Sequence, residues 1–213
     1  MSTTLVDAFG AVGPQWVGDG SVAPVRLDKT GNVVLHTVHG KYFEAAGRGA
    51  MFVASQAVGG VAPGTALDDA PALALWNPPG SGVLCVIQRV SGGYISGTLG
   101  AGTLVHAVNP SQRTAPTTGT EIVPTGAFLG NMRSKTRAYT LSTVSATVVI
   151  LRPSLHLGAA LATTVTFPAI ATDEVNGSIV IPPAGVWAYH GVAAAGTTPL
   201  TIMSVLFEEI PIV

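Results

Sequence analysis

Histidine is the residue type in this chain best suited to metal binding or acid–base catalysis, and it occurs five times. His36 and His39 form a short H-x-x-H pattern on a predicted strand. Residues three apart on a strand face opposite sides of the sheet, so this pair does not easily share one metal ion. His106, His156 and His190 have no neighbouring cysteine or carboxylate pattern. The sequence therefore predicts no metal site.

Two pairs of adjacent carboxylates, Asp68-Asp69 and Glu208-Glu209, are the next candidates for chemistry. A glycosidase needs two carboxyl groups roughly 5–9.5 Å apart across a cleft. Asp68-Asp69 lies in a Gly- and Pro-rich loop, where acids cap turn backbone, and Glu208-Glu209 ends a predicted strand. We expect both pairs to be solvated or to cap backbone groups. No G-x-S-x-G or P-loop motif is present, so we predict no catalytic residue, no cofactor and no enzymatic activity.

The single cysteine, Cys85, alternates with Val83 and Ile87 in a predicted strand. One cysteine cannot form an intrachain disulfide, and no CxxC metal motif exists. We expect Cys85 to be a small buried hydrophobic residue rather than a nucleophile.

Charge is scarce in this chain of 213 residues: charged residues make up 10% and the net charge is −1. Ordinary soluble domains carry about 25%. No basic cluster could neutralise a row of phosphates, so no nucleic-acid partner is expected. The polybasic and positive-inside patterns of membrane proteins are missing as well. Near-neutral charge and only three lysines leave strand edges unprotected, which predicts a homo-oligomer, most simply a trimer.

The C-terminal stretch Val175–Phe207 contains no charged residue. Turn signals at Asn176-Gly177, Pro182–Gly185 and Gly196–Pro199 divide it and exclude a continuous membrane helix. The stretch therefore predicts three strands, Ser178–Ile181, Gly185–Ala193 and Leu200–Glu208.

Short strands separated by Gly and Pro turns are predicted upstream as well, among them Tyr42–Ala46 and Gly82–Val90, the latter ending at a Ser91-Gly92-Gly93 turn. No helical pattern exceeds about two turns. The sequence predicts an all-β protein, with less than about a tenth of its residues in helix, folded as an antiparallel, jelly-roll-like β-sandwich.

The predicted domain organisation is an irregular N-terminal arm, residues 1–20, followed by the β-sandwich, residues 21–213. The arm carries Leu5, Val6, Phe9 and Trp16 between glycines, and we interpret these four residues as partner-binding. The loop 109–126 joins either two halves of the domain or two packed sheets. We expect the arm or this loop to make the main contact with a larger surface.

A resemblance to a known class of proteins rests on two stretches. Ser178–Gly185, with the strands up to Glu208-Glu209-Ile210-Pro211, resembles the closing strands of small virion proteins of tailed bacteriophages. Gly49–Ala54 through Leu73–Pro78 is similar to the same group. The resemblance implies a β-sandwich that decorates or cements a capsid, often as a trimer, or a related spike component. It implies a virion location, with the major capsid protein or other virion proteins as partners, and no active-site residue.

Two alternatives differ in class. A carbohydrate- or receptor-binding spike or fibre module would use the same sandwich with aromatic side chains stacked on a sugar, and the candidates are Trp76, Tyr94, Trp187 and Tyr189. Most of these are expected in the core or an interface. A cupin-like or glycosidase enzyme would need the histidine or acid clusters that the sequence does not supply.

Overall fold

The computed structural model describes residues 40–128, 133–157, 170–192 and 196–212. The chain divides into two units, Met1–Lys41 and Tyr42–Val213. The expected arm, residues 1–20, and its boundary with the sandwich lie outside the described residues. Within the described ranges, no helix has the length and apolar character needed to cross a membrane.

The described part of Tyr42–Val213 is built almost entirely from strands, which confirms the predicted all-β class. Its one described helix, α1 (Phe43–Gly47), has five residues. The strands are β1 (Met51–Ser55), β2 (Leu73–Asn77), β3 (Val83–Ser96), β4 (Gly102–Asn109), β5 (Thr120–Ile122), β6 (Thr125–Gly126), β7 (Arg137–Thr140), β8 (Val149–Leu157), β9 (Ile170–Ile181), β10 (Gly185–Val192) and β11 (Leu200–Pro211).

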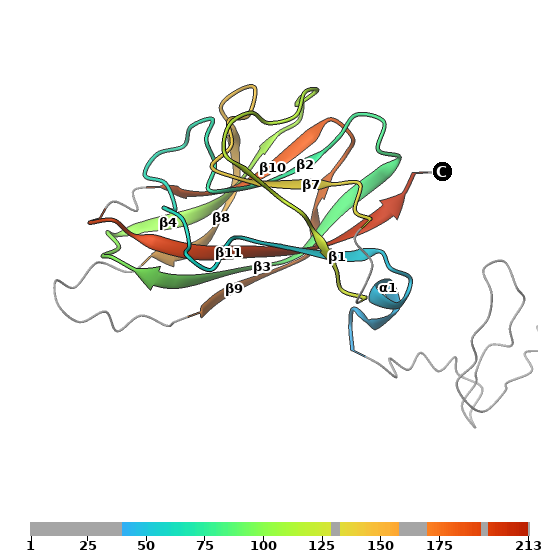
Figure 1. Ribbon diagram of the computed structural model, residues 1–213, viewed down its shortest axis with the longest axis horizontal. Helices are drawn as coiled ribbons and strands as arrows, with labels where there is room; N and C mark the ends of the chain where they lie inside the picture. The colour runs from blue at the N-terminus through green and yellow to red at the C-terminus, as the bar shows by residue number, and fades with distance from the viewer. Residues whose placement is uncertain (1–39, 129–132, 158–169, 193–195, 213) are drawn as a thin grey trace, which may run out of the picture. The chain divides into compact units, whose positions relative to one another are not determined.

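Two antiparallel sheets pack as a sandwich, as predicted (Figure 1). One sheet has the order β6-β1-β11-β3-β9, and the other has the order β5-β7-β2-β10-β4-β8. The eight longer strands pair from the outside of the sequence inwards: β1 with β11, β2 with β10, β3 with β9, and β4 with β8. As a result, β8 and β9, which follow one another in sequence, are edge strands of different sheets.

The main core lies between the two sheets and includes Phe52, Phe207, Trp187 and Tyr189. Alternating burial along β11 shows why its sequence forms a strand of this core: Met203, Val205 and Phe207 point inwards, and the residues between them are partly exposed. A second apolar cluster, containing Trp76 and Val186, covers the other face of the six-stranded sheet.

The loop 109–126 contains two short strands that pair with different sheets. β5 pairs with β7 at the edge of the six-stranded sheet, and β6 pairs with β1 at the edge of the five-stranded sheet. The loop therefore passes from one sheet to the other inside the single unit Tyr42–Val213.

Three local predictions are wrong. Tyr42–Ala46 is largely helical, since α1 begins at Phe43. The Ser91-Gly92-Gly93 segment continues β3 because it is paired on both sides, with β11 and with β9, and this pairing outweighs the low strand preference of glycine. Asn176-Gly177 forms a bulge within β9 rather than a turn that ends a strand: Ile87 of β3 pairs with Ile179, and Arg89 pairs with Glu174.

Candidate functional site

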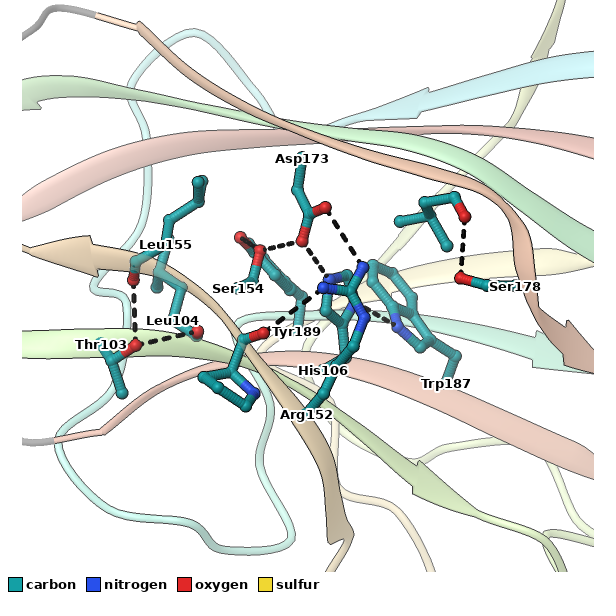
Figure 2. Close-up of polar contacts among 12 residues, drawn as sticks. Thr103, Leu104, His106, Arg152, Ser154, Leu155, Asp173, Ser178, Trp187 and Tyr189 are labelled. Atoms are coloured by element: carbon teal, nitrogen blue, oxygen red, sulfur yellow. Dashed lines mark hydrogen bonds and ion pairs between the residues drawn. The ribbon is translucent and has the colours of Figure 1, made fainter.

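A cluster of polar side chains lies between the sheets where β4, β8, β9 and β10 meet (Figure 2). We call it the His106 cluster. It consists of His106 from β4, Arg152 and Ser154 from β8, Asp173 from β9, and Trp187 and Tyr189 from β10. His106 and Tyr189 are directly opposite in the β4–β10 register. The cluster therefore connects the six-stranded sheet to the edge strand β9 of the other sheet.

Both ring nitrogens of His106 are engaged, and their partners fix its tautomer. The indole Nε1 of Trp187 lies 3.0 Å from Nδ1, and an indole N–H can only donate, so Nδ1 accepts. The hydrogen is therefore on Nε2, which donates to Asp173 Oδ2 at 2.8 Å. His106 and Trp187 are completely buried.

Asp173 accepts hydrogen bonds from three side chains. Ser154 Oγ donates to Oδ2 at 2.5 Å, and Arg152 donates to Oδ1 at 3.2 Å, in addition to the bond from His106. Because the Ser154 hydrogen points at Asp173, the Tyr189 hydroxyl, 2.9 Å from Ser154 Oγ, is the donor to Ser154. The carboxylate thus holds side chains from β4 and β8 against β9.

Burial and hydrogen bonding set the charges in the cluster. Burial lowers the pKa of His106, an effect that the hydrogen bond to Asp173 opposes and the charge of Arg152 reinforces. Burial by itself would raise the pKa of Asp173, but the hydrogen bonds from Ser154, His106 and Arg152 outweigh it and lower the pKa. Burial also raises the pKa of Tyr189. At neutral pH the cluster therefore holds a neutral imidazole, a carboxylate, a guanidinium and a neutral phenol.

Ser154, His106 and Asp173 are the residue types of a hydrolytic triad, but their geometry differs from one. A triad needs the serine hydroxyl to donate to a histidine nitrogen. Here Ser154 donates to the carboxylate, and Trp187 occupies the histidine nitrogen that remains. This arrangement gives Ser154 no histidine base, and its hydroxyl connects strands of the two sheets.

The sequence-predicted carboxylates mostly serve the backbone. Asp68 Oδ1 accepts from the backbone nitrogen of Ala70 at 2.8 Å and lies 2.9 Å from His190 Nε2. Glu209, which is buried, accepts from the backbone nitrogens of Lys135 and Thr136. These two acids cap backbone groups as predicted. Glu209 is not solvated, because the end of β11 is covered by residues 134–136.

The five histidines are not brought together where the structure describes them. His36 and His39 lie outside the described residues, as does the side chain of His156. His106 and His190 point to different surroundings, the first to Asp173 and the second to Asp68. Within the described ranges, no group of three or more His, Cys, Asp or Glu side chains is arranged to hold a metal ion.

Cys85 is completely buried, as predicted, and burial raises the pKa of its thiol. The aromatic residues considered for sugar stacking are also in the interior. Trp187 and Tyr189 are fully buried, and Trp76 is 6% exposed with its indole nitrogen bonded to the carbonyl of Gln112. Tyr94 is partly buried and bonds the carbonyl of Gly97. The three buried rings of Trp76, Trp187 and Tyr189 therefore present no open face of the kind that a sugar needs.

An uncharged apolar surface lies beside the His106 cluster on the same two edge strands. We call it the apolar edge, and it consists of Val149, Ile150 and Leu151 of β8 and Val180 of β9, exposed to 64%, 46%, 51% and 47%. An open groove of about 310 Å³ accompanies it. The apolar walls of the groove include Val108, Leu151, Ile179, Ile181, Pro182 and Val186, and none of its lining residues is charged.

The two edge strands are irregular at and next to the apolar edge. In β8, Pro153 lacks a backbone N–H, and the register with β4 shifts on both sides of it. In β9, the bulge places Asn176 and Gly177 in left-handed conformations, at φ 52° and 77°. Such features hinder the addition of further strands to a sheet. The apolar edge is therefore a place for side-chain contacts rather than for a long added strand.

Of the predicted partner-binding residues, Leu5, Val6, Phe9 and Trp16 all lie outside the described residues, and their role stays a prediction. The sequence did not point to the His106 cluster or to the apolar edge. A weak signal for the cluster was one histidine within the apolar run Leu104–Val108. The signal for the edge was the uninterrupted run Val148–Leu151, which reads as a core strand.

Comparison of the chain with protein-family models, with curated proteins and with solved structures gives no match.

Proposed function

We propose that this chain is a structural virion protein of the tailed-phage type, which decorates the outside of a capsid and stabilises the shell by binding to it. The observation that carries the proposal is the apolar edge: four exposed aliphatic side chains, of which Leu151 and Val180 line an uncharged groove. Exposed apolar side chains that line a groove are typical of protein-binding sites. The groove fits an uncharged, apolar side chain from the capsid protein.

The strand order supports the same proposal. Among the eight longer strands, the first pairs with the last, the second with the seventh, the third with the sixth and the fourth with the fifth. This is the pattern of a long hairpin rolled into two sheets. We assign it as a jelly roll, an architecture that occurs in viral capsid proteins and in lectins. The resemblance of Ser178–Gly185 and the following strands to small phage virion proteins favours the viral alternative.

The energetics suit a protein that is present in many copies. Burying one of these half-exposed aliphatic side chains contributes about 1 kcal/mol, so one docked edge binds weakly. Several edges presented by one oligomer on one shell raise the effective affinity strongly. Binding the assembled shell and not its free subunits then stabilises the shell by mass action.

The test is cosedimentation of the chain with shells from which it has been removed, comparing Leu151→Asp with the wild type. Leu151 is 51% exposed and lines the groove, so an aspartate there is expected to weaken shell binding about tenfold or more, because a charge would be buried without a partner. Val58→Asp is the matched control, since Val58 is 88% exposed and lies outside the groove. Wild-type occupancy by the Leu151→Asp variant would contradict the assignment of the apolar edge.

Deletion of residues 2–18 tests the predicted arm in the same assay. If the deletion abolishes binding and Leu151→Asp does not, the arm containing Phe9 and Trp16 is the anchor and the apolar edge is not.

A further inference from the structure

We propose that His106 is a proton-sensitive contact for the apolar edge: when Nδ1 takes up a proton, the contact with Trp187 breaks and the packing of β8 and β9 around the groove loosens. The loosening is a property of the protein alone. Its effect on docking rests on the proposed function.

The two hydrogen bonds that His106 makes have opposite polarity. Nδ1 accepts from the Trp187 indole, and Nε2 donates to Asp173. A proton on Nδ1 would place two N–H donors against each other at a site where the nitrogens are 3.0 Å apart. Both rings are fully buried, so water cannot replace the lost acceptor without a local opening of the structure.

The ionisable groups around His106 are Asp173 from β9, Arg152 from β8 and the phenol of Tyr189 from β10. Burial keeps Tyr189 neutral. Asp173 stays ionised in mild acid because three side chains donate to it. Protonation of His106 would thus add a second cation next to Arg152 on one carboxylate. Because burial lowers the pKa of His106 in the closed structure, acid acts by favouring the locally opened one, in which the hydrated imidazole takes up a proton in the ordinary range of histidine.

The His106 cluster is directly connected to the groove. Trp187 is opposite Val108 in the β4–β10 register, and both Val108 and the neighbouring Val186 line the groove. Arg152 follows Leu151 of the apolar edge along β8. Asp173 is on β9, the strand that contributes Val180. A shift of the Trp187 ring or of the Asp173 contacts therefore acts on strands that form the walls of the groove.

Hydrogen exchange of the full chain tests the proposal between about pH 7.5 and about pH 5, the range in which an ordinary histidine changes charge. After correction for intrinsic exchange, the wild-type amides of β8 and β9 are expected to lose about tenfold in protection in acid. Nitrogen NMR of the imidazole at neutral pH should show the hydrogen on Nε2.

The decisive variant is His106→Gln. A glutamine amide offers one acceptor and one donor on either side of a carbon atom, as the imidazole does, so it can accept from Trp187 and donate to Asp173 without titrating. This variant is expected to keep its β8 and β9 protection in acid. His190→Gln is the matched control: it replaces the other described buried histidine, which contacts Asp68, and should retain the wild-type response to acid.

Unchanged wild-type protection in acid, or the same loss in His106→Gln as in the wild type, would overturn the proposal, as would a hydrogen on Nδ1 at neutral pH. Shell binding measured at both pH values separates the two proposals. If acid loosens β8 and β9 but leaves shell binding unchanged, the proton-sensitive contact stands and the docking role of the apolar edge fails.

Discussion

Gly64 lies against the imidazole of His190, and the approach leaves no room for a side chain. A Cβ atom placed on Gly64 would come within 2.7 Å of His190 Nδ1. Gly64 also has a φ of +91°, a left-handed conformation that other residues rarely adopt. The loop over the end of β10 is further held by Asp68, whose Oδ1 lies 2.9 Å from His190 Nε2.

Gly64→Ala is expected to lower the free energy of unfolding by about 3 kcal/mol, because it combines backbone strain with a clash. Gly80→Ala is the control: Gly80 also has a positive φ, 73°, but its Cβ would meet nothing within 4 Å. That change should cost only about 1 kcal/mol, from the backbone conformation alone. Urea unfolding of both variants measures the difference. Equal losses would mean that the contact with His190 contributes nothing.

The carboxylate of Glu209 is predicted to be essential for the packing of residues 134–136. Its Oε1 accepts from Ser134 Oγ and from the backbone nitrogens of Lys135 and Thr136, at 2.7–2.8 Å. Glu209→Gln keeps an acceptor at Oε1 but places an amide NH2 group against the backbone N–H of Lys135, which lies 3.1 Å from Oε2, and we expect a loss of about 2 kcal/mol in the free energy of unfolding. Glu208→Gln, next to it on the opposite face of β11, should cost about 0.5 kcal/mol. A Glu209→Gln variant as stable as the wild type would contradict the hydrogen bonding described.

Acid is predicted to destabilise the fold. The pKa values of His106 and Asp173 are both lower in the folded protein than their ordinary values of 6.5 and 3.8. The unfolded chain therefore binds protons more readily, and the free energy of unfolding falls as the pH falls. The His106 contribution is complete above its ordinary pKa and decreases below it, and the Asp173 contribution decreases below its own ordinary pKa. Urea unfolding across this range checks the sign, and a free energy of unfolding that rises in acid would contradict it.

Cys85 should not react in the native protein. It is fully buried, and burial raises the pKa of its thiol, so little thiolate is present or accessible. A maleimide reagent near neutral pH is expected to leave native Cys85 unmodified and to label it completely in denaturant. Because Cys85 is the single cysteine of the chain, the mass of the product gives the answer directly. Rapid labelling under native conditions would show that this part of β3 opens readily.

The chain is expected to form a homotrimer. Its net charge of −1 and its three lysines give little protection against association. Analytical ultracentrifugation at micromolar concentration measures the state. Leu151→Asp should sediment like the wild type, because we assign the apolar edge to the shell and not to the contact between subunits. A monomeric wild type would contradict the prediction.

Regular alternation and turn residues in the sequence predict the fold class correctly, and the errors occur where tertiary pairing outweighs a local signal. Gly92 and Gly93 read as a turn, yet β11 and β9 pair with them on both sides. Asn176-Gly177 is predicted as a turn, but Ile179–Ile181, which follow these two residues, continue to pair with β3. The two residues therefore form a bulge. No local pattern records which strands will flank a segment.

The candidate site was less predictable than the fold. His106 and Asp173 are separated by 67 residues and come from different sheets, so their contact has no signature in sequence spacing. The run Val148–Leu151 predicts a strand, but hydropathy alone does not say that the strand lies at an edge. Val148 is buried, whereas Val149, Ile150 and Leu151 are exposed. Edge position is a consequence of the strand order of the whole sheet.

The pairing of β1 with β11 has a kinetic consequence. Met51 and Glu208 are partners in a ladder that joins distant parts of the chain, and β11 lies between β1 and β3 although it follows them both in sequence. The five-stranded sheet cannot form completely until β11 has been synthesised. Until then, the edges of β1 and β3 that pair with β11 stay unpaired. A topology dominated by contacts of such long sequence separation folds slowly. Newly made chains are therefore most at risk of aggregation before this last pairing forms, and holding them apart during synthesis should improve the yield of folded protein.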